Sequence, residues 1–247
     1  KYGVTSIDLK KILSCQDINK VKAYASTLRN QKGEIYDKTY STFFLGGNYS
    51  KRDKLCLSSD NPFLKIALNP SILMIVNSYL NKKCNLVDIQ FAESFPSNNS
   101  ERKKSQRWHR DPAITNLIKV FVYFSEVTKD NGPFEFISGT HYKKNRDATY
   151  GPKSTKIFGG SFYPEQTAIE SFIDKEDPKI LRFTGSYGRV IISDTSGFHR
   201  GGYCQKDSRL MLTLVYYPKI EPIRSRLKIE GPNNHFSSFQ KSNLSLF

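Results

Sequence analysis

The spacing of apolar residues changes once along the chain, near residue 86, and this change restricts the possible fold more than any other feature. Between residues 6 and 30, apolar side chains recur every three or four positions, which predicts an amphipathic helix. Two shorter helices are predicted at residues 61–68 and 70–81. From residue 86 onward, apolar and polar residues alternate, which is the pattern of strands with one buried face.

Five segments of the second part of the chain are predicted strands. They are residues 86–92, 117–127, 134–137, 188–194 and 209–217. The polar segments between and around them are expected to be loops, with a short helix at the end of the polar insertion at 142–180. Helices followed by many strands predict an all-β barrel or sandwich that is buttressed by N-terminal helices.

The chain is strongly basic, with 38 Lys and Arg against 23 Asp and Glu and a net charge of +15. Such a charge fits either an anionic partner or a solubilising surface. The lysines are scattered and no nucleic-acid-binding motif is present, so a charged surface without a nucleic-acid partner is favoured. No apolar run reaches the ~18 residues of a membrane span, and the first residues do not resemble a secretory signal. The four cysteines form no CxxC pair, which favours reduced thiols in a cytoplasmic protein.

The stretch QRWHRDPAI, residues 106–114, lies where a polar run meets a predicted strand. Residues at positions i and i+2 of a strand point to the same side, so the imidazole of His109 and the carboxylate of Asp111 can be directed at one point. These two side chains supply two of the three protein ligands of the facial triad that holds non-haem Fe(II). A third ligand would have to come from another histidine.

Two later histidines, His141 and His199, are candidates for the third ligand. His199 lies in SGFHRGG, directly after a predicted strand, and the neighbouring glycines allow the backbone to pass close to a bound ion. His141 ends a predicted hairpin strand and is better suited to stabilising a turn, and His235 in the polar tail is expected to be solvated. His199 is therefore the favoured third ligand.

Ten residues after His199, Arg209 begins the last predicted strand. Alternation places Arg209, Met211 and Thr213 on one face. An arginine that points into a barrel requires an anion, and a carboxylate matches the fork of its guanidinium group. An exposed arginine paired with Asp207 or Asp194 is the alternative. The upstream His-x-Asp and the glycine-flanked histidine favour the anion-binding role.

Several stretches of this sequence together resemble one enzyme family. They are WHRD, LIKVFVYFSEVTKDNGPFEFISGTH, GRVIISDTSGFHRGG and Arg209. Over about residues 86–217 they resemble the phytanoyl-CoA dioxygenase family of Fe(II)- and 2-oxoglutarate-dependent oxygenases. The resemblance implies a mainly β fold with N-terminal helices, a double-stranded β-helix of the cupin-like jelly-roll type. It implies one oxygenase domain over 1–247, with a helical buttress at 1–85, the catalytic core at 86–217 and a tail at 218–247.

The resemblance also implies roles for individual residues and cofactors. His109, Asp111 and His199 would bind Fe(II), Arg209 would bind the distal carboxylate of 2-oxoglutarate, and Gln90 stands where some members use a glutamine on this cosubstrate. With O2 as the oxidant, the implied reaction oxidises an unactivated C–H bond of a small-molecule metabolite, most simply by hydroxylation, as in a biosynthetic pathway. Because position 111 is Asp and not Gly or Ala, the resemblance indicates an oxygenase and not a halogenase.

Three further residues are candidates for the substrate pocket. Lys119 has the same strand parity as Asp111, and Glu135 on the next strand is placed to pair with Lys119, either within a polar pocket or as a plain cross-strand ion pair. Trp108 is suited either to capping the pocket or to packing beneath a lid. The lids are expected at 101–107 and 142–166.

Two other functional classes compete with a small-molecule oxygenase. The first is a nucleic-acid- or protein-modifying oxygenase, which only the net charge of +15 suggests. The second is a non-catalytic ligand-binding jelly roll. The three candidate iron ligands together with Arg209 count against the second class.

Overall fold

The structure is a computed structural model that carries all side chains of the residues it describes. The described residues are 2–31, 35–37, 42–46, 55–96, 101–111, 117–142, 162–219, 227–232 and 234–244. The predicted lid at 142–166 lies largely outside these ranges.

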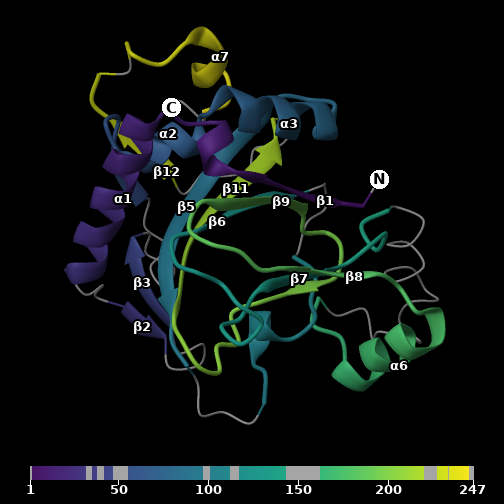
Figure 1. Ribbon diagram of the computed structural model, residues 1–247. Coiled ribbons are helices and arrows are strands. Elements are labelled where there is room, and N and C mark those ends of the chain that lie inside the picture. Colours follow the sequence, from purple (N-terminus) through teal and green to yellow (C-terminus); the bar gives the residue numbers. More distant parts are fainter. Residues whose placement is uncertain are drawn as a thin grey trace.

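A large antiparallel sheet forms the centre of the molecule (Figure 1). Its strand order is β1-β9-β6-β11-β5-β3-β2. The strands are β1 (Val4–Asp8), β2 (Ile35–Asp37), β3 (Thr42–Gly46), β5 (Cys84–Ser94), β6 (Ile118–Tyr123), β9 (Arg189–Asp194) and β11 (Arg209–Pro218). The five strands predicted from residue 86 onward are present, four of them in this sheet.

A second, smaller sheet faces the first one. It has the order β10-β7-β8 and consists of β7 (Phe134–Ile137), β8 (Ile180–Phe183) and β10 (His199–Arg200). Aromatic residues fill the space between the sheets, and the rings of Phe121 on β6 and Phe134 on β7 lie 4.6 Å apart. Two facing antiparallel sheets form the jelly roll that the resemblance implies. That part of the prediction is confirmed.

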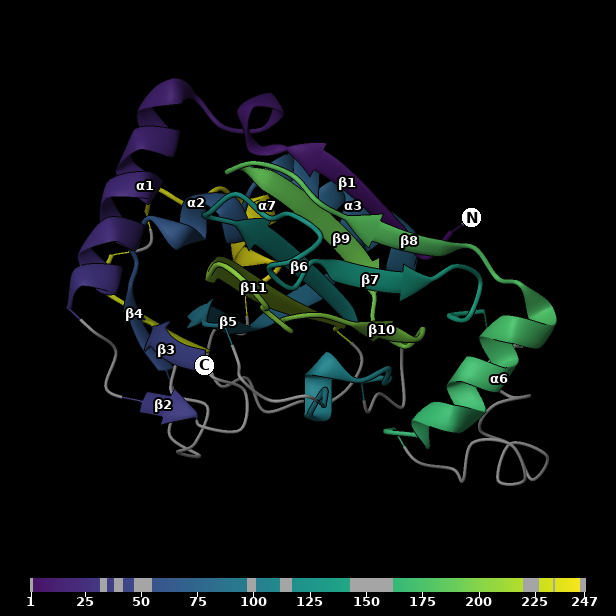
Figure 2. The ribbon, with the colours of Figure 1, turned by 60° about the horizontal axis from the view of Figure 1, so that its bottom comes forward.

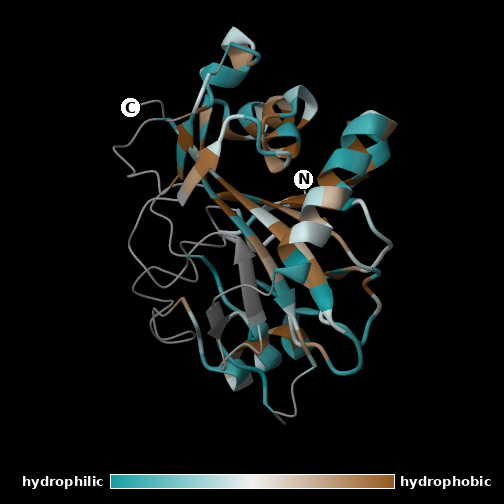
Figure 3. Ribbon diagram, turned by 90° about the vertical axis from the view of Figure 1, so that its left-hand side faces the viewer, coloured by the Kyte–Doolittle hydropathy of each residue, from teal (hydrophilic) through white to brown (hydrophobic). Residues whose placement is uncertain are grey.

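Helices cover the outer face of the large sheet, away from the small one (Figure 2). The helical segments are η1 (Leu9–Lys11), α1 (Cys15–Asn30), α2 (Phe63–Ala67), α3 (Pro70–Leu80), η2 (Lys104–Gln106), α6 (Gln166–Glu176) and α7 (Ser238–Lys241). Helices α1, α2 and α3 pack on the large sheet, whereas α6 lies beside β7 and β10, at the far side of the molecule from α1. In Figure 3, hydrophobic residues gather in the strands and in the helices that pack on them.

Strand alternation separates the two faces of the large sheet. On β11, Leu210, Leu212 and Leu214 pack into the helix-covered core, while Arg209 and Met211 point to the opposite side and line a cavity. Strands β5 and β6 alternate in the same way. The period of two that the sequence shows therefore builds an apolar layer under the helices and, between the sheets, a second layer that holds both an aromatic cluster and the cavity.

The N-terminal third contains strands as well as helices, which differs from the predicted helical buttress at 1–85. The predicted helix at 6–30 begins only at Cys15, because Ser14 caps it by accepting a hydrogen bond from the backbone N–H of Asp17 at 3.1 Å. Residues before this cap form β1, which pairs with β9 at the edge of the large sheet. The tail also contributes a strand, β12 (Leu227–Glu230), which pairs in parallel with β4 (Leu55–Ser58).

Helix length and polarity also bear on membrane association. Among the residues described, no helix is long and apolar enough to cross a bilayer.

Candidate active site

His109 and His199 lie opposite each other on neighbouring backbone segments. The backbone N–H of each residue donates to the carbonyl oxygen of the other at 3.0 Å. These two hydrogen bonds form an antiparallel bridge between the His109 segment and β10. Directly opposed residues of an antiparallel pair point to the same side. The two imidazole rings accordingly lie with centroids 4.2 Å apart, although 90 positions separate them in the sequence.

Both rings are oriented by the backbone. Nδ1 of His109 lies 2.9 Å from the carbonyl oxygen of Arg107, and Nδ1 of His199 lies 3.0 Å from that of Gly197. A carbonyl oxygen only accepts, so each Nδ1 carries the proton and each Nε2 presents a lone pair to the space between the rings.

Burial keeps both histidines neutral. It lowers the pKa of His109, and it lowers the pKa of His199 to about 3. A neutral imidazole is the form that coordinates a metal ion.

Asp111 completes the group. Its backbone N–H donates to the carbonyl oxygen of Thr195 at 3.0 Å, and its Oδ2 lies 3.7 Å from Nε2 of His199 and 2.7 Å from Nζ of Lys119. Burial alone would raise the pKa of this carboxyl, but the nearby charge of Lys119 and its hydrogen bond outweigh it and hold the pKa well below its usual range. The carboxylate is therefore ionised at neutral pH.

The three side chains form a donor set suited to a metal ion. One ligand atom from each of His109, Asp111 and His199 lies within 4.8 Å of the others, and this is the only group of three such residues found in the described part of the chain. Two imidazole nitrogens and one carboxylate oxygen are the donors of the facial triad that binds non-haem Fe(II). These residues fit such an ion.

His141 and His235 lie elsewhere. His141 is buried, and a side chain on Gly3 would collide with its ring, since a Cβ at Gly3 would come within 2.3 Å of Nδ1. The exposed His235 has its Nε2 3.1 Å from the carbonyl oxygen of Ser59. Of the alternatives that the sequence left open, His199 is the histidine that the fold brings to His109 and Asp111.

A cavity of about 350 Å³ opens beside these three residues, between the two sheets. The residues that line it include all three members of the triad, Lys119, Gln90 and Arg209. Its other lining residues are Thr42, Ala92, Ser94, Ser105, Gln106, Phe121, Phe134, Tyr163, Arg200, Gly201, Gly202, Met211 and Thr213.

Arg209 is buried at one end of this cavity. Its Nη1 donates to the carbonyl oxygen of Gly132 at 2.6 Å, and its Nε has no hydrogen-bond partner in the described structure. Gly201 and Gly202 leave room for the guanidinium group, since a Cβ on these residues would lie 3.2 Å from Nη1 and 3.1 Å from Nη2. A buried guanidinium with unused donors, facing a cavity, is suited to a carboxylate.

Gln90 lies on β5, where it is paired in register with Thr213 of β11. Its Nε2 donates to Oδ2 of Asp88 at 2.8 Å, and the residue lines the same cavity as Arg209. Gln90, Ala92 and Ser94 are alternate residues of β5, so their side chains point to the same face of the strand, and all three line the cavity.

Lys119 and Glu135, two of the candidate substrate-pocket residues, form ion pairs with other partners than each other. Lys119 lines the cavity but pairs with Asp111 and not with Glu135. Glu135 pairs instead with Arg182 and Arg200, which stand directly opposite it on the flanking strands β8 and β10. The expected Lys119–Glu135 pair is therefore absent.

Trp108 lies outside the cavity lining. It is buried in a small apolar cluster with Ile137, Phe198 and Ile169 of α6. Of its two expected positions, the structure shows the packed one, beneath α6.

Arg110 lies between His109 and Asp111 in the sequence but does not line the cavity. Its side chain is fully buried, and its Nη1 donates to the carbonyl oxygens of Thr140 and Ser196 at 3.1 and 3.0 Å. Its guanidinium group also stacks on the ring of Phe198 at 3.9 Å.

Tyr163 was not singled out from the sequence, although its ring stacks in parallel on His109 with a centroid distance of 5.0 Å. It follows the long polar insertion, where no periodic pattern connects it with the strands. Ser94, by contrast, continues the alternation of Gln90 and could have been found by extending the predicted strand by two residues.

Comparison with known proteins agrees with this geometry. The family model described as phytanoyl-CoA dioxygenase (PhyH) matches residues 12–202. No curated protein matches the sequence.

Solved structures share the fold at low sequence identity. The non-haem α-ketoglutarate-dependent epimerase SnoN from nogalamycin biosynthesis is 12% identical, with 94% of this chain and 92% of that chain covered and a TM-score of 0.58. EctD from S. alaskensis, with bound Fe, is 15% identical, with 88% and 73% covered and a TM-score of 0.58. HygX from Streptomyces hygroscopicus, with nickel, 2-oxoglutarate and hygromycin B bound, is 14% identical, with 89% and 84% covered and a TM-score of 0.54.

The family match spans more than half of the chain and includes the His109-x-Asp111 pair and His199. The chain therefore belongs to the phytanoyl-CoA dioxygenase family of Fe(II)- and 2-oxoglutarate-dependent oxygenases.

Proposed function

We propose that this chain oxidises a C–H bond of a small-molecule metabolite, with Fe(II) held by His109, Asp111 and His199 and with 2-oxoglutarate held by Arg209. The observation that carries the proposal is the convergence of three ligand atoms within 4.8 Å beside a cavity that also contains a buried arginine with unused donors. When bound, Fe(II) and 2-oxoglutarate would supply the O2-activating chemistry.

The protein's own contribution is to fix the ligands before the metal arrives. Hydrogen bonds to the carbonyls of Arg107 and Gly197 orient both Nε2 atoms, so little rearrangement is needed on binding. Three protein ligands leave three positions of an octahedral ion for 2-oxoglutarate and O2. The ionised Asp111 also offsets part of the charge of the ion.

The same cavity offers a place for the cosubstrate, because Arg209 lines it together with the triad. A dicarboxylate that chelates the metal at one end can place its distal carboxylate against Arg209, whose fork offers two parallel donors. The hydroxyls of Ser94 and Thr213 and the amide of Gln90 lie along the same wall. We assign Gln90 a role in binding the cosubstrate, because it lines this cavity and because the family resemblance implies the same role.

The size and lining of the cavity favour a small organic substrate. A volume of about 350 Å³ is at the lower end of typical small-molecule sites. Phe121, Phe134 and Met211 give it apolar surface next to the metal-binding residues. HygX and SnoN, according to their descriptions, were solved with hygromycin B and with nogalamycin RO, both small molecules.

A spectroscopic titration tests this assignment. Anaerobic addition of Fe(II) and 2-oxoglutarate is expected to produce a weak visible metal-to-ligand charge-transfer band, which the His109→Ala variant should lack. His235→Ala is the matched control, because His235 is exposed and far from the triad, and it should keep the band. A full band in His109→Ala would contradict the ligand assignment.

A further inference from the structure

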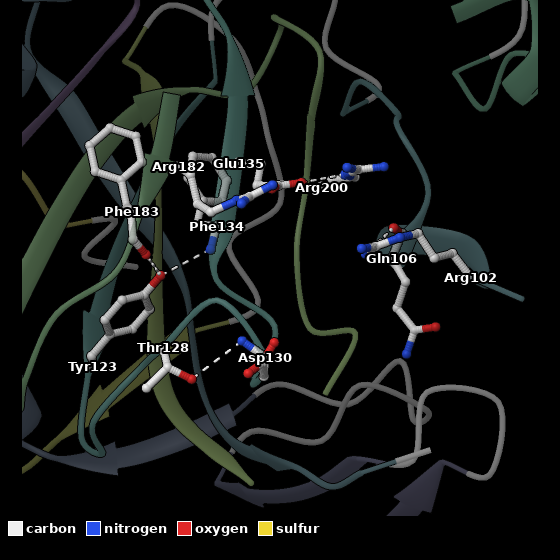
Figure 4. A network of polar contacts seen from close by, with 10 residues as sticks. All are labelled: Arg102, Gln106, Tyr123, Thr128, Asp130, Phe134, Glu135, Arg182, Phe183 and Arg200. Carbon is white, nitrogen blue, oxygen red and sulfur yellow. Dashed lines mark hydrogen bonds and ion pairs between the residues drawn. The ribbon is translucent and has the colours of Figure 1, made fainter. Parts of the chain in front are cut away.

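A cluster of arginine side chains lies around the carboxylate of Glu135 (Figure 4), and one of them, Arg200, lines the cavity. We define this arginine cluster as Arg102, Arg182 and Arg200 with the carboxylate of Glu135. Nε of Arg182 lies 2.5 Å from Oε1 of Glu135, and Nε of Arg200 lies 2.5 Å from Oε2 of the same carboxylate. Figure 4 shows these two arginines on opposite sides of Glu135, with Arg102 on the side of Arg200.

Arg200 connects the cluster to the active site. It follows His199 directly on β10, lines the cavity and has a side chain that is 20% exposed. Its guanidinium carbon lies 4.3 Å from the ring centre of Trp108, so the group is held flat against an aromatic surface. Arg200 is therefore both part of the cavity wall and accessible to solvent.

The cluster carries a surplus of two positive charges, because one carboxylate is shared among three guanidinium groups. Burial raises the pKa of Glu135, but the charges and hydrogen bonds of Arg200 and Arg182 outweigh it, and the net shift is downward. Burial and the charge of Arg200 in turn lower the pKa of Arg102. Cations held this close repel one another unless an anion lies among them.

The cluster also has unused hydrogen-bond donors. Within the described structure, the hydrogen bonds of Arg200 and Arg182 use Nε alone. Nη1 of Arg102 makes a long contact of 3.5 Å to the carbonyl oxygen of Gln106, and its guanidinium carbon lies 4.6 Å from the ring centre of Tyr203. The Nη groups of Arg182 and Arg200 are therefore available as charged donors. Several guanidinium donors in one place are suited to a group with several acceptor oxygens.

We propose that the arginine cluster binds a phosphate group carried by the substrate, with Arg200 and Arg102 as its direct contacts and Arg182 and Glu135 as positioning residues. This inference rests on the proposed function of the neighbouring cavity and specifies its substrate class as a phosphorylated small molecule. A phosphate monoester carries about −1.5 to −2 charges at pH 7, which balances the surplus of the cluster. The net charge of +15 then includes a contribution with a specific role.

Calorimetric titration with phenyl phosphate tests the proposal, using protein loaded with Fe(II) and 2-oxoglutarate under anaerobic conditions. Phenylacetate at the same ionic strength serves as the carboxylate probe. We expect phenyl phosphate to bind more tightly than phenylacetate, and Arg200→Gln to weaken its binding about ten- to a hundredfold, the loss typical of a hydrogen bond to a charged group. Lys228→Gln removes an exposed lysine that pairs only with Glu230 in the described structure, and it should leave binding within about twofold.

Arg102→Gln is the second variant, because it leaves both ion pairs of Glu135 intact and so avoids exposing a buried carboxylate. It should weaken phenyl phosphate binding while the protein unfolds at its normal temperature. The proposal is overturned if the loaded protein does not bind phenyl phosphate, if phenylacetate binds equally well, or if the arginine variants bind like Lys228→Gln. Displacement of 2-oxoglutarate by phenyl phosphate would also overturn it, because the anion would then occupy the Arg209 end.

The charge-transfer band separates this test from that of the proposed function. A normal band without phenyl phosphate binding would refute only the phosphate site. Absence of the band together with binding that depends on Arg200 would refute the iron assignment and support the anion site.

Discussion

At the scale of single residues, each imidazole of the triad donates its Nδ1 proton to the carbonyl of the residue two positions earlier. This arrangement is local, so it follows from the short motifs around His109 and His199. It leaves both Nε2 atoms unprotonated and directed at Asp111. The electrostatic effect of the nearby Lys119 then keeps the carboxylate ionised even though it is largely buried.

Arg209→Lys should selectively weaken 2-oxoglutarate binding. A lysine keeps the charge but loses the fork, so the dissociation constant should rise by about one to two orders of magnitude, equivalent to 1.5–3 kcal/mol. The measurement is a titration of the Fe(II)-loaded variant with 2-oxoglutarate, followed by the visible band. Fe(II) affinity measured in parallel should be nearly unchanged. An unaltered dissociation constant for 2-oxoglutarate would show that Arg209 does not contact the cosubstrate.

Metal-free protein should lose stability on mild acidification because of His199. Its pKa is about 3 in the folded protein and near 6.5 in a solvated chain, so the unfolded chain takes up a proton first as the pH falls. The stabilising contribution is complete above the unfolded value and is lost as the pH falls from about 6.5 toward 3. Urea denaturation at a series of pH values should show a shallower decline for His199→Gln. Equal slopes would contradict this assignment.

The sequence predicted that His109, Asp111 and His199 lie together, but it did not predict the ion pairs of Glu135. A His-x-Asp motif, a glycine-flanked histidine and a strand-initial arginine are local patterns that can be recognised without knowing the fold. The partner of Glu135 depends on the order of strands in the small sheet, which puts Arg182 and Arg200 opposite it. No local pattern encodes that order, so the expected pair with Lys119 was wrong.

At the scale of elements, Arg110 ties together the two loops that flank the triad. One loop follows β7 and contains Thr140; the other joins β9 to β10 and contains Ser196. The arginine lies between His109 and Asp111 in the sequence, on the opposite side of the backbone from their side chains. Its two hydrogen bonds therefore fix the segment that carries both ligands.

Arg110→Met should destabilise the protein by about 2–4 kcal/mol, because it keeps the apolar stem but leaves two buried carbonyl oxygens without their donor. The free energy of unfolding in urea measures this loss. Fe(II) affinity should fall as well, since the ligand segment is no longer held. Lys228→Met provides a control on an ion pair whose two side chains are both about half exposed, and it should cost less than Arg110→Met.

Elements with a strong period were predicted well, and short strands at sheet edges were not. Strands β6 and β11 have long apolar alternation, whereas β10 is two residues long and is defined only by its pairing with β7. The helix predicted from residue 6 overlaps the end of β1 (Val4–Asp8). The apolar positions there are so few that they fit the helical period as well as the strand period. Pairing with β9, a contact across the whole chain, decides the outcome.

At the scale of the whole molecule, both ends of the described chain join the central structure. Strand β1 extends the large sheet, and Leu244 forms a bridge with Leu86 next to β5. We propose that the described residues form a single oxygenase domain on this basis. The separation into buttress, core and tail that the sequence suggested divides regions that are joined by backbone hydrogen bonds.

The net charge of +15 should confer only weak, salt-sensitive nucleic-acid binding. Because the cavity that contains the triad is small, addition of DNA or RNA should not increase succinate release above the rate without substrate. The measurement is succinate formation with and without single-stranded oligonucleotides at two salt concentrations. A nucleic-acid-dependent increase would favour the macromolecule-modifying alternative.

The central claim is that His109, Asp111 and His199 together hold one ferrous ion next to Arg209. A crystal structure of the chain loaded anaerobically with Fe(II) and 2-oxoglutarate, with anomalous diffraction at the iron edge, tests it most directly. We predict one iron peak coordinated by both Nε2 atoms and an Asp111 oxygen, with the distal carboxylate of 2-oxoglutarate on Arg209. An iron peak bound by other residues, or a cosubstrate that does not reach Arg209, would contradict the account.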